Sequence, residues 1–359
     1  MTLLTTLAIG LLQALPVPAA LPPPLFIVQD LPDANGTVTK RALVRVALDR
    51  EHRCSLDTIV TKDQRFFGHF GGHYVWDESY VATRSGGVID TLAKQVINDV
   101  QHGELLGFEA PRVIYRVHNG QETNSIYAFD LRSKTVEKLA SPGHWKLFGG
   151  KSPDKQKGVG ANGAGLVVVI QLAAAEVGRD KTAIDIHCPR DVSLSGETFQ
   201  CLWLDDERIL THAKAGELLL SNINGNIAPW LTIDGAKEDR LSRPRLTTDR
   251  LGRIIYRCGN ADYLIDVKAQ AASKLEWHAL GHDFEASAGG TPRAIRYLGK
   301  EIGRWECDPY AVQTAPGLIA LPFRKTGEPG ARYLAVWSLK RGEWQVQNIL
   351  VNNVIGWGP

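Results

Sequence analysis

Short apolar segments separated by polar turns run through most of this 359-residue chain. The clearest run lies between residues 243 and 278, where apolar segments occupy 245–248, 253–258, 263–267 and 273–277. β-Branched, aromatic and aliphatic side chains fill these segments, and Asp, Gly and Asn separate them. No helix of ordinary length fits between such breakers. The pattern therefore predicts four antiparallel strands in a row.

A meander of four strands within about 35–45 residues has the size of one β-propeller blade. Comparable sets of apolar segments recur at 73–100, 112–139, 165–188, 198–233 and 310–349. Asp side chains recur at matching turns, because a short Asp turn bonds its own backbone and favours antiparallel neighbours. They are Asp77, Asp205 and Asp249 after first strands, and Asp130 and Asp266 at third strands, where Ser338 takes the same place. The repeats predict a propeller.

The two ends of the chain complement each other. The first set, within 25–60, has only three strands, and the tail at 351–357 is a spare strand. Pairing them would remove the open edges that β-sheets must hide. We therefore predict an all-β fold, a seven-bladed β-propeller of four-stranded antiparallel blades, closed by a C-terminal strand that completes the first blade. Residues 289–306 are either a decorated loop or a hairpin of an eighth blade, so six and eight blades remain alternatives.

This blade pattern resembles the broad group of secreted propellers with WD40-like and TolB-type repeats. The resemblance covers nearly the whole mature chain, but only as a pattern of blades. The paired Gly-His and Trp-Asp signatures of true WD40 repeats are absent, and Trp76-Asp77 is a single occurrence at a different strand position. The resemblance therefore implies a fold and assigns no catalytic residue.

The first 20 residues have the features of a signal peptide. A short apolar core is followed by small residues up to Ala19 and Ala20, although no Lys or Arg precedes the core. The core is too short to span a bilayer comfortably, and the alternative is a buried element at the start of the domain. We expect a signal peptide at 1–20, a Pro-rich spacer at 21–24 and one propeller domain at 25–359. This predicts a secreted or periplasmic protein with no membrane span after cleavage.

Composition narrows the functional classes. The chain is 44% hydrophobic and 22% charged with a formal net charge of +2, which indicates a globular protein and gives no basic stripe for nucleic acid. Five Cys without a CxxC pair do not make a zinc site or a disulfide framework. A single bridge between Cys188 and Cys201 and buried free thiols remain alternatives. We expect a monomer that needs no cofactor and does not bind nucleic acid.

Candidate ligand residues lie in three Gly- and His-rich segments, at 66–73, 142–158 and 278–290. We interpret all three as connections from an outer strand to the inner strand of the next blade. Such connections share one face, the mouth of the propeller, and loops on a rigid scaffold are where function concentrates. The predicted ligand-binding residues are His69, His73, His144, Trp145, Lys146, Lys151, His278, His282 and Asp283.

Two kinds of chemistry fit these residues. Trp145 beside several Lys side chains could receive a sugar acid or an acidic peptide. The pairs His69/His73 and His278/His282 have HxxxH spacing and could share a metal with a third ligand such as Asp283 or His144. The alternative is that these His side chains bond turn carbonyls or pack on aromatic rings.

We predict an extracytoplasmic binding scaffold that engages a protein or a glycan through its mouth loops. The alternative is a metal-assisted polysaccharide lyase or hydrolase that uses His69, His73, His278 and His282. The two hypotheses differ in geometry, because the enzyme requires at least three of these side chains to converge on one point.

Overall fold

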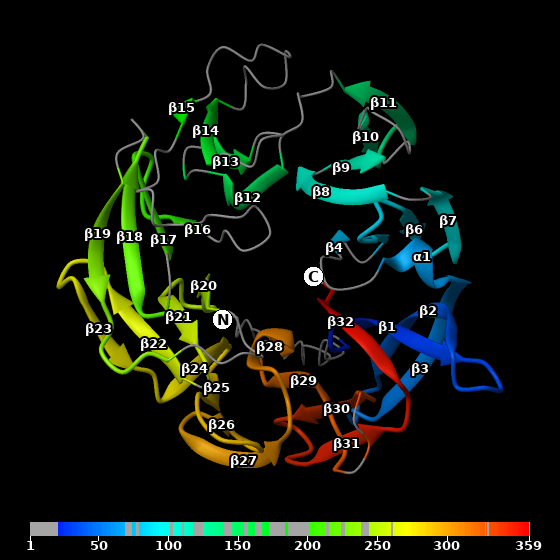
Figure 1. Cartoon of the computed structure of the whole chain (residues 1–359). Helices are drawn as coiled ribbons and strands as arrows, with labels where there is room; N and C mark the ends of the chain where they lie inside the picture. Colours follow the sequence, from blue (N-terminus) through cyan, green and yellow to red (C-terminus); the bar gives the residue numbers. More distant parts are fainter. Residues whose placement is uncertain are drawn as a thin grey trace, which may run out of the picture.

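The structure is a computed structural model in which strands form a ring around a central opening (Figure 1). In a few strands only the path of the backbone is described. The described residues are 21–68, 74–76, 79–100, 103–109, 111–117, 125–139, 146–151, 153, 157–161, 167–171, 184–185, 201–212, 215–223, 227–237, 244–259, 261–326, 328 and 330–358.

The described strands form eight four-stranded antiparallel sheets. From the innermost to the outermost strand, the first four are β32 (Val351–Trp357), β1 (Leu25–Pro32), β2 (Val38–Leu48), β3 (Cys54–Asp63); β4 (Tyr74–Trp76), β5 (Tyr80–Ala82), β6 (Val88–Asp90), β7 (Gln95–Asn98); β8 (Gly103–Glu109), β9 (Arg112–Val117), β10 (Ser125–Asp130), β11 (Thr135–Leu139); and β12 (Lys146–Lys151), β13 (Lys157–Ala161), β14 (Val167–Gln171), β15 (Ile184–Asp185). The other four are β16 (Cys201–Trp203), β17 (Arg208–His212), β18 (Glu217–Asn222), β19 (Ile227–Thr232); β20 (Arg245–Thr248), β21 (Ile254–Cys258), β22 (Ala261–Asp266), β23 (Ala271–Lys274); β24 (Trp277–Gly281), β25 (Phe284–Ser287), β26 (Arg293–Tyr297), β27 (Lys300–Trp305); and β28 (Gln313–Ala315), β29 (Leu318–Phe323), β30 (Tyr333–Ser338), β31 (Trp344–Gln347).

The all-β class, the four-stranded antiparallel blades and the propeller are confirmed, and the expected blade number of seven is corrected to eight. The additional sheet is the seventh, β24 to β27, and it contains the ambiguous segment 289–306. That segment contains the hairpin β26–β27, one of its two predicted interpretations. The hairpin was hard to recognise because its turn is Leu298-Gly299, with no Asn or Asp to mark it.

The C-terminal strand closes the ring as predicted. β32 pairs antiparallel with β1, with Leu25 opposite Trp357 and Ile27 opposite Val354. The first sheet therefore combines the start and the end of the described chain, and β1 has partners on both edges. In Figure 1 the red β32 lies beside the blue β1, between β1 and the centre of the ring.

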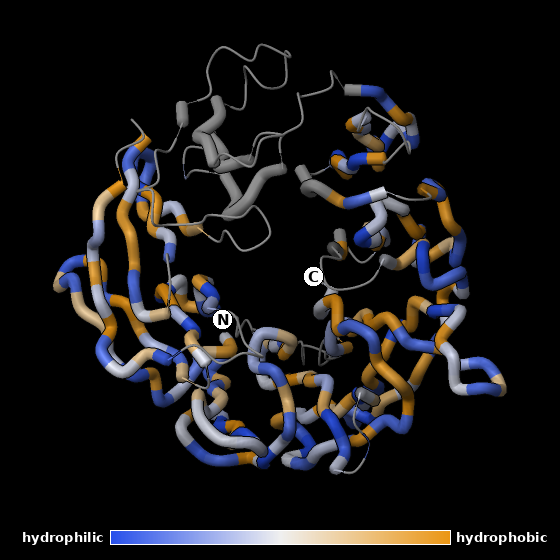
Figure 2. Tube along the Cα trace, in the orientation of Figure 1, coloured by the Kyte–Doolittle hydropathy of each residue, from blue (hydrophilic) through white to orange (hydrophobic). Residues whose placement is uncertain are grey.

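The hydrophobic core lies between neighbouring sheets. Leu318 and Ala320 of β29 pack toward the first sheet, whereas Ile319 and Leu321 pack toward the seventh. Alternate residues of a strand point to opposite faces, so a strand covered on both faces has an unbroken apolar sequence. All six residues of β29 are buried for this reason. Hydrophobic residues recur along the strands of the ring, and the β1–β2 turn is hydrophilic (Figure 2).

Asp side chains set the recurring turns between third and fourth strands. The carboxylates of Asp90, Asp130 and Asp266 each accept backbone N–H bonds from the residues two and three positions later. The residue four positions after each Asp has a positive φ, which lets the hairpin close tightly. The predicted equivalence of Asp130 and Asp266 is confirmed. Asp205 and Asp249 also hold equivalent first-to-second strand turns, and Asp77 lies outside the described residues.

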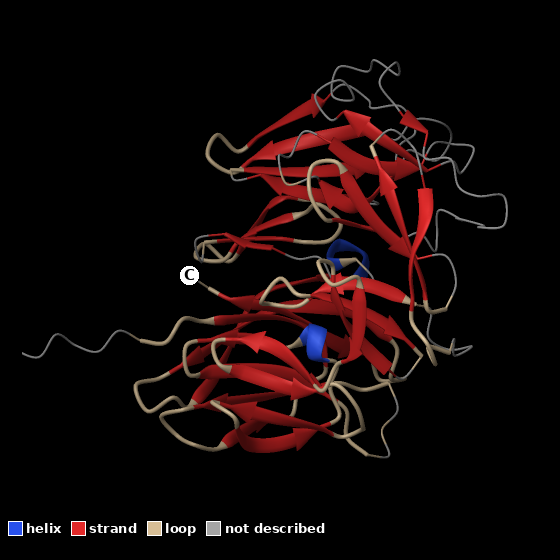
Figure 3. Cartoon of the chain, turned by 90° about the vertical axis from the view of Figure 1, so that its left-hand side faces the viewer, coloured by secondary structure: helices blue, strands red, loops and turns tan. Residues whose placement is uncertain are grey.

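Helix contributes little to the described chain, as the side view shows (Figure 3). The two short helical turns are α1 (Gln64–Phe67) and η2 (Pro309–Ala311), and both lie in connections from an outer strand to the next inner strand. Phe66 and Phe67 of α1 are buried between the first two sheets. Among the described residues, no helix is long and apolar enough to cross a membrane.

Candidate functional site

The structure describes only part of the predicted mouth site. His69, His73, His144 and Trp145 lie outside the described residues. Lys146 and Lys151 are the first and last residues of β12, the innermost strand of the fourth sheet. The expectation that they belong to a loop was wrong, because the segment between them pairs with β13.

The assignment of 278–290 to a mouth loop was also wrong. His278 lies within β24, and His282 and Asp283 form the turn from β24 to β25, which is a first-to-second strand turn. Such turns lie on the face opposite the mouth. The apolar side chains Leu280 and Phe284 pack into the core against the eighth sheet, and this packing makes strands of a segment whose Gly and His suggest a loop.

The described His residues do not assemble a metal site. Nε2 of His278 lies 2.7 Å from Oδ2 of Asp262, and Nδ1 of His282 lies 3.1 Å from Oγ1 of Thr314. Each imidazole therefore has a different partner from a different sheet. Within the described parts of the chain, no three His, Cys, Asp or Glu side chains come together as metal ligands.

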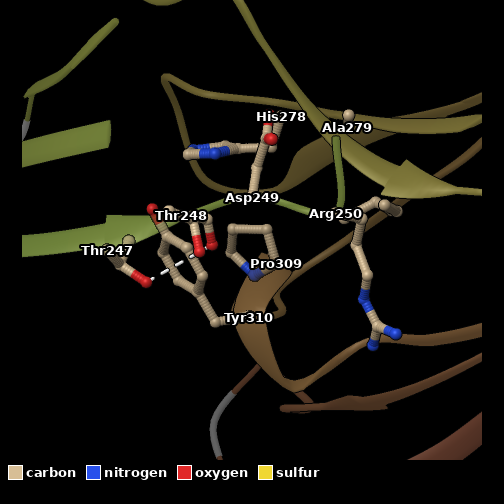
Figure 4. Close-up of a pocket in the computed structure, with 9 residues that line it drawn as sticks. Thr247, Thr248, Asp249, Arg250, His278, Ala279, Pro309 and Tyr310 are labelled. Carbon is tan, nitrogen blue, oxygen red and sulfur yellow. Dashed lines mark hydrogen bonds between the residues drawn. The ribbon is translucent and has the colours of Figure 1, made fainter. Parts of the chain in front are cut away.

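A cavity of about 310 Å³ lies between the inner strands of the sixth and seventh sheets and the helical turn η2. The end of β20 and its turn form one side, β24 forms the floor, and η2 forms the other side (Figure 4). Its lining residues are Thr247, Thr248, Asp249, Arg250, His278, Ala279, Leu280, Pro309 and Tyr310. The volume is at the lower end of the roughly 300–1,000 Å³ typical of small-molecule sites.

A buried polar cluster supports the cavity from below. Asp262 of β22 accepts bonds from His278 and from Nε of Arg257, both at 2.7 Å. The Arg257 guanidinium lies 4.8 Å from the centre of the Tyr310 ring, and the rings of His278 and Tyr310 meet edge to face at 5.4 Å. The cluster thus joins the sixth and seventh sheets to η2 and holds Tyr310 at the cavity wall.

Burial and charge set the protonation of this cluster. Burial by itself would raise the pKa of the Asp262 carboxyl, but hydrogen bonds from His278 and Arg257 and the guanidinium charge outweigh it and lower the pKa below 3.8. Burial, followed by the nearby Asp262 charge, raises the pKa of Tyr310 to about 12. At neutral pH Asp262 is therefore a carboxylate, and Tyr310 keeps a proton that it can donate to a ligand.

Arg250 adds a positive charge at the opposite side of the cavity from Tyr310 (Figure 4). Its Nη2 donates to the carbonyl of Val312 at 3.1 Å and to Oε1 of Gln313 at 2.8 Å. The side chain thus extends from the sixth sheet to the eighth. Sequence reasoning missed Arg250, Thr247 and Tyr310, because no spacing in the chain indicates that β20 and its turn lie beside the distant segment η2.

Comparisons with known proteins support the fold and go no further. No family model matches the chain, and no curated protein matches it. The dihydro-heme d1 dehydrogenase NirN, solved in complex with DHE, is 13% identical with a TM-score of 0.51, over 92% of this chain and 73% of NirN. This likeness agrees with the observed class, an all-β propeller.

Two more distant structures also match. TolB from Acinetobacter baumannii is 13% identical over 94% of this chain and 83% of its own, with a TM-score of 0.39. PorZ, a surface component of the type-IX secretion system of Porphyromonas gingivalis, is 12% identical over 91% of this chain, with a TM-score of 0.38. The chain spans only 46% of the PorZ chain.

Proposed function

We propose that this protein is a binding propeller that works outside the cytoplasm and engages a protein or a glycan through the inner strands and loops of its ring. The observation that carries the proposal is the cavity formed by β20, β24 and η2. Pro309 and Tyr310 come from an outer-to-inner connection, the kind that the mouth hypothesis selects, whereas Asp249 and Arg250 come from a first-to-second strand turn. The function therefore rests on a formed cavity with convergent polar groups on a closed scaffold.

The lining groups suit recognition. Thr247, Thr248 and Tyr310 carry hydroxyls, and Ala279 with Leu280 provides an apolar floor. None of these hydroxyls makes a hydrogen bond that holds two strands together in the described structure; Thr247 bonds only the carbonyl of its neighbour, at 3.4 Å. They are therefore available to a ligand.

Export is proposed from the sequence of residues 1–20, and the first described strand, β1, begins at Leu25, just after the Pro-rich spacer. Removal of a signal peptide after Ala19 or Ala20 would therefore leave every described strand intact. Intact-mass measurement of protein recovered from the medium or the periplasm tests this, and a full-length cytoplasmic product would contradict it.

The binding proposal is tested by titration calorimetry on residues 21–359. The probes are a neutral glucose tetramer, a galacturonic acid tetramer and an acidic hexapeptide. We expect at least one to bind, with binding weakened about tenfold or more in the double variant Thr247→Val, Thr248→Val, which removes two hydroxyls at nearly constant shape. Thr232→Val, at an exposed position on β19, is the matched control. Binding that both variants leave unchanged would place the ligand elsewhere.

A further inference from the structure

The cavity contains an arginine that the fold does not neutralise. Its turn, Asp249-Arg250-Leu251-Gly252-Arg253, repeats the pattern of Asp49-Arg50-Glu51-His52-Arg53. In both turns Oδ1 of the Asp accepts N–H bonds from the residues two and four positions later, and Oδ2 accepts Nε of the second Arg. The Asp and the second Arg therefore satisfy each other in both places.

The first Arg of each turn takes no part in that pairing. Arg50 lies in the turn between β2 and β3, away from the inner strands, whereas Arg250 follows the innermost strand β20 and lines the cavity. Its Nη2 is held by the carbonyl of Val312 and by Gln313. Its Nε and Nη1 have no hydrogen-bond partner among the described residues, and no described carboxylate lies within ion-pair distance. This side chain is thus positioned and still has donors to offer.

Two carboxylates at or below the cavity are paired with arginines, and a third, Asp308, lies near enough to influence Tyr310 and Arg257. Asp249 is bound to Arg253 at 2.6 Å, and Asp262 is bound to Arg257 at 2.7 Å. Arg250 takes part in neither ion pair, so its guanidinium brings a positive charge and free donors to the described lining. An anionic group, above all a carboxylate, would gain charge-assisted hydrogen bonds there.

The opposite side of the cavity has a different character. Thr247, Thr248 and Tyr310 lie there (Figure 4), and Ala279 and Leu280 add apolar side chains to the lining. A pyranose ring has matching properties, because hydroxyls surround its rim and C–H groups cover its faces. Thr247 and Thr248 offer side-chain hydroxyls from β20 and Tyr310 offers one from η2, and such groups can both donate to and accept from sugar hydroxyls.

We infer that the cavity binds an acidic sugar residue of a glycan, with its carboxylate on Arg250 and its hydroxyls on Thr247, Thr248 and Tyr310. This inference rests on the proposed binding function and names its ligand class. The volume of about 310 Å³ suits a recognition site for one or two sugar units of a longer chain.

Arg50 provides the control, since Arg250→Ala and Arg50→Ala remove the same residue from the same type of turn. Calorimetry with a galacturonic acid trimer and a galactose trimer at 50 and 500 mM NaCl measures the preference for the acid. We expect wild type and Arg50→Ala to bind the acidic trimer about tenfold more tightly, with the preference reduced by salt. Arg250→Ala should bind both trimers at the affinity of the neutral one.

The outcomes separate the two proposals. Equal binding of both trimers by wild type, or a preference that survives in Arg250→Ala, overturns the acidic sugar and leaves the binding function standing. Arg250-dependent binding of an acidic hexapeptide without binding of the acidic trimer also overturns the sugar class. Failure of wild type to bind any trimer, tetramer or peptide probe overturns the binding function itself.

Discussion

His278 donates a hydrogen bond from Nε2 to Oδ2 of Asp262 over 2.7 Å, and the two side chains are only 2% and 3% exposed. Because the lowered pKa keeps Asp262 ionised, the carboxylate accepts and the proton lies on Nε2 of His278. The bond joins β22 of the sixth sheet to β24 of the seventh. It therefore fixes the floor of the cavity at the boundary between two sheets.

Removing the Asp262 carboxylate should strongly lower the free energy of unfolding. Asp262→Ala leaves the half-buried Arg257 guanidinium and the buried His278 without their acceptor, and breaking a buried ion pair costs about 3–5 kcal/mol. Glu301→Ala, which breaks the exposed pair with Arg304, should cost less than about 1 kcal/mol. The free energy of unfolding in urea measures both. Equal losses in the two variants would show that the buried cluster contributes no more than a surface pair.

Asp262 should also make stability depend on pH at the acidic end. Its pKa is lowered in the folded protein, so its contribution is present above the ordinary Asp pKa of about 3.9 and is lost as pH falls through the folded value. Asp262→Asn should therefore lose less stability than wild type between about pH 5 and pH 2. Urea unfolding at a series of pH values gives the two slopes. If the free energy of unfolding falls equally with pH in both proteins, Asp262 does not contribute to the acid destabilisation.

The closing strand should be essential to the ring. Val354 is 3% exposed and packs in the cluster between the first and eighth sheets, so Val354→Asp buries a charge with no partner there. We expect a loss of about 4 kcal/mol or more, with self-association through the exposed edge of β1. Val346→Asp, at a position 49% exposed on the outermost strand β31, should cost less than about 1 kcal/mol. Denaturation and light scattering compare the variants, and a stable monomeric Val354→Asp protein would contradict a closed ring.

A substitution in the turn between β26 and β27 should stabilise the protein. Leu298 has a φ of 49° and is 68% exposed, so it occupies a left-handed conformation without burying its side chain. Asn tolerates this conformation better, and Leu298→Asn should raise stability by about 0.5–1 kcal/mol. Leu251 has the same 68% exposure without a positive φ, so Leu251→Asn should change little. Thermal unfolding measures the stability of both variants. An equal change in the two would show that the positive φ of Leu298 is not the cause.

Local patterns in the sequence were sufficient to predict most of the fold. Alternating apolar positions and Asp turns predict strands wherever they are dense, and the spare strand at 351–357 matches β32 to the residue. The seventh sheet was ambiguous because its signals are weak. β24 and β25 contain Ala, Gly and His where other sheets have branched residues, and packing against the eighth sheet determines their structure.

The candidate site could not be predicted in the same way. Thr247 comes from β20, His278 from β24 and Tyr310 from η2, and the packing of consecutive sheets brings them to one cavity. Arg250 lies in a turn whose sequence pattern also occurs at Arg50, so nothing local distinguishes the two arginines. The mouth hypothesis selected Gly- and His-rich segments, two of which include inner strands in the structure.

The pairing of β1 with β32 also sets the order of events during biosynthesis. A chain emerges from the ribosome N-terminus first, so Leu25 cannot pair with Trp357 until all the residues between them have been made. Contacts between such distant residues are slow to form, because a long loop must close before they stabilise anything. A chain cut short during translation keeps an unpaired strand edge, a feature by which proteases and chaperones can distinguish unfinished molecules from complete ones.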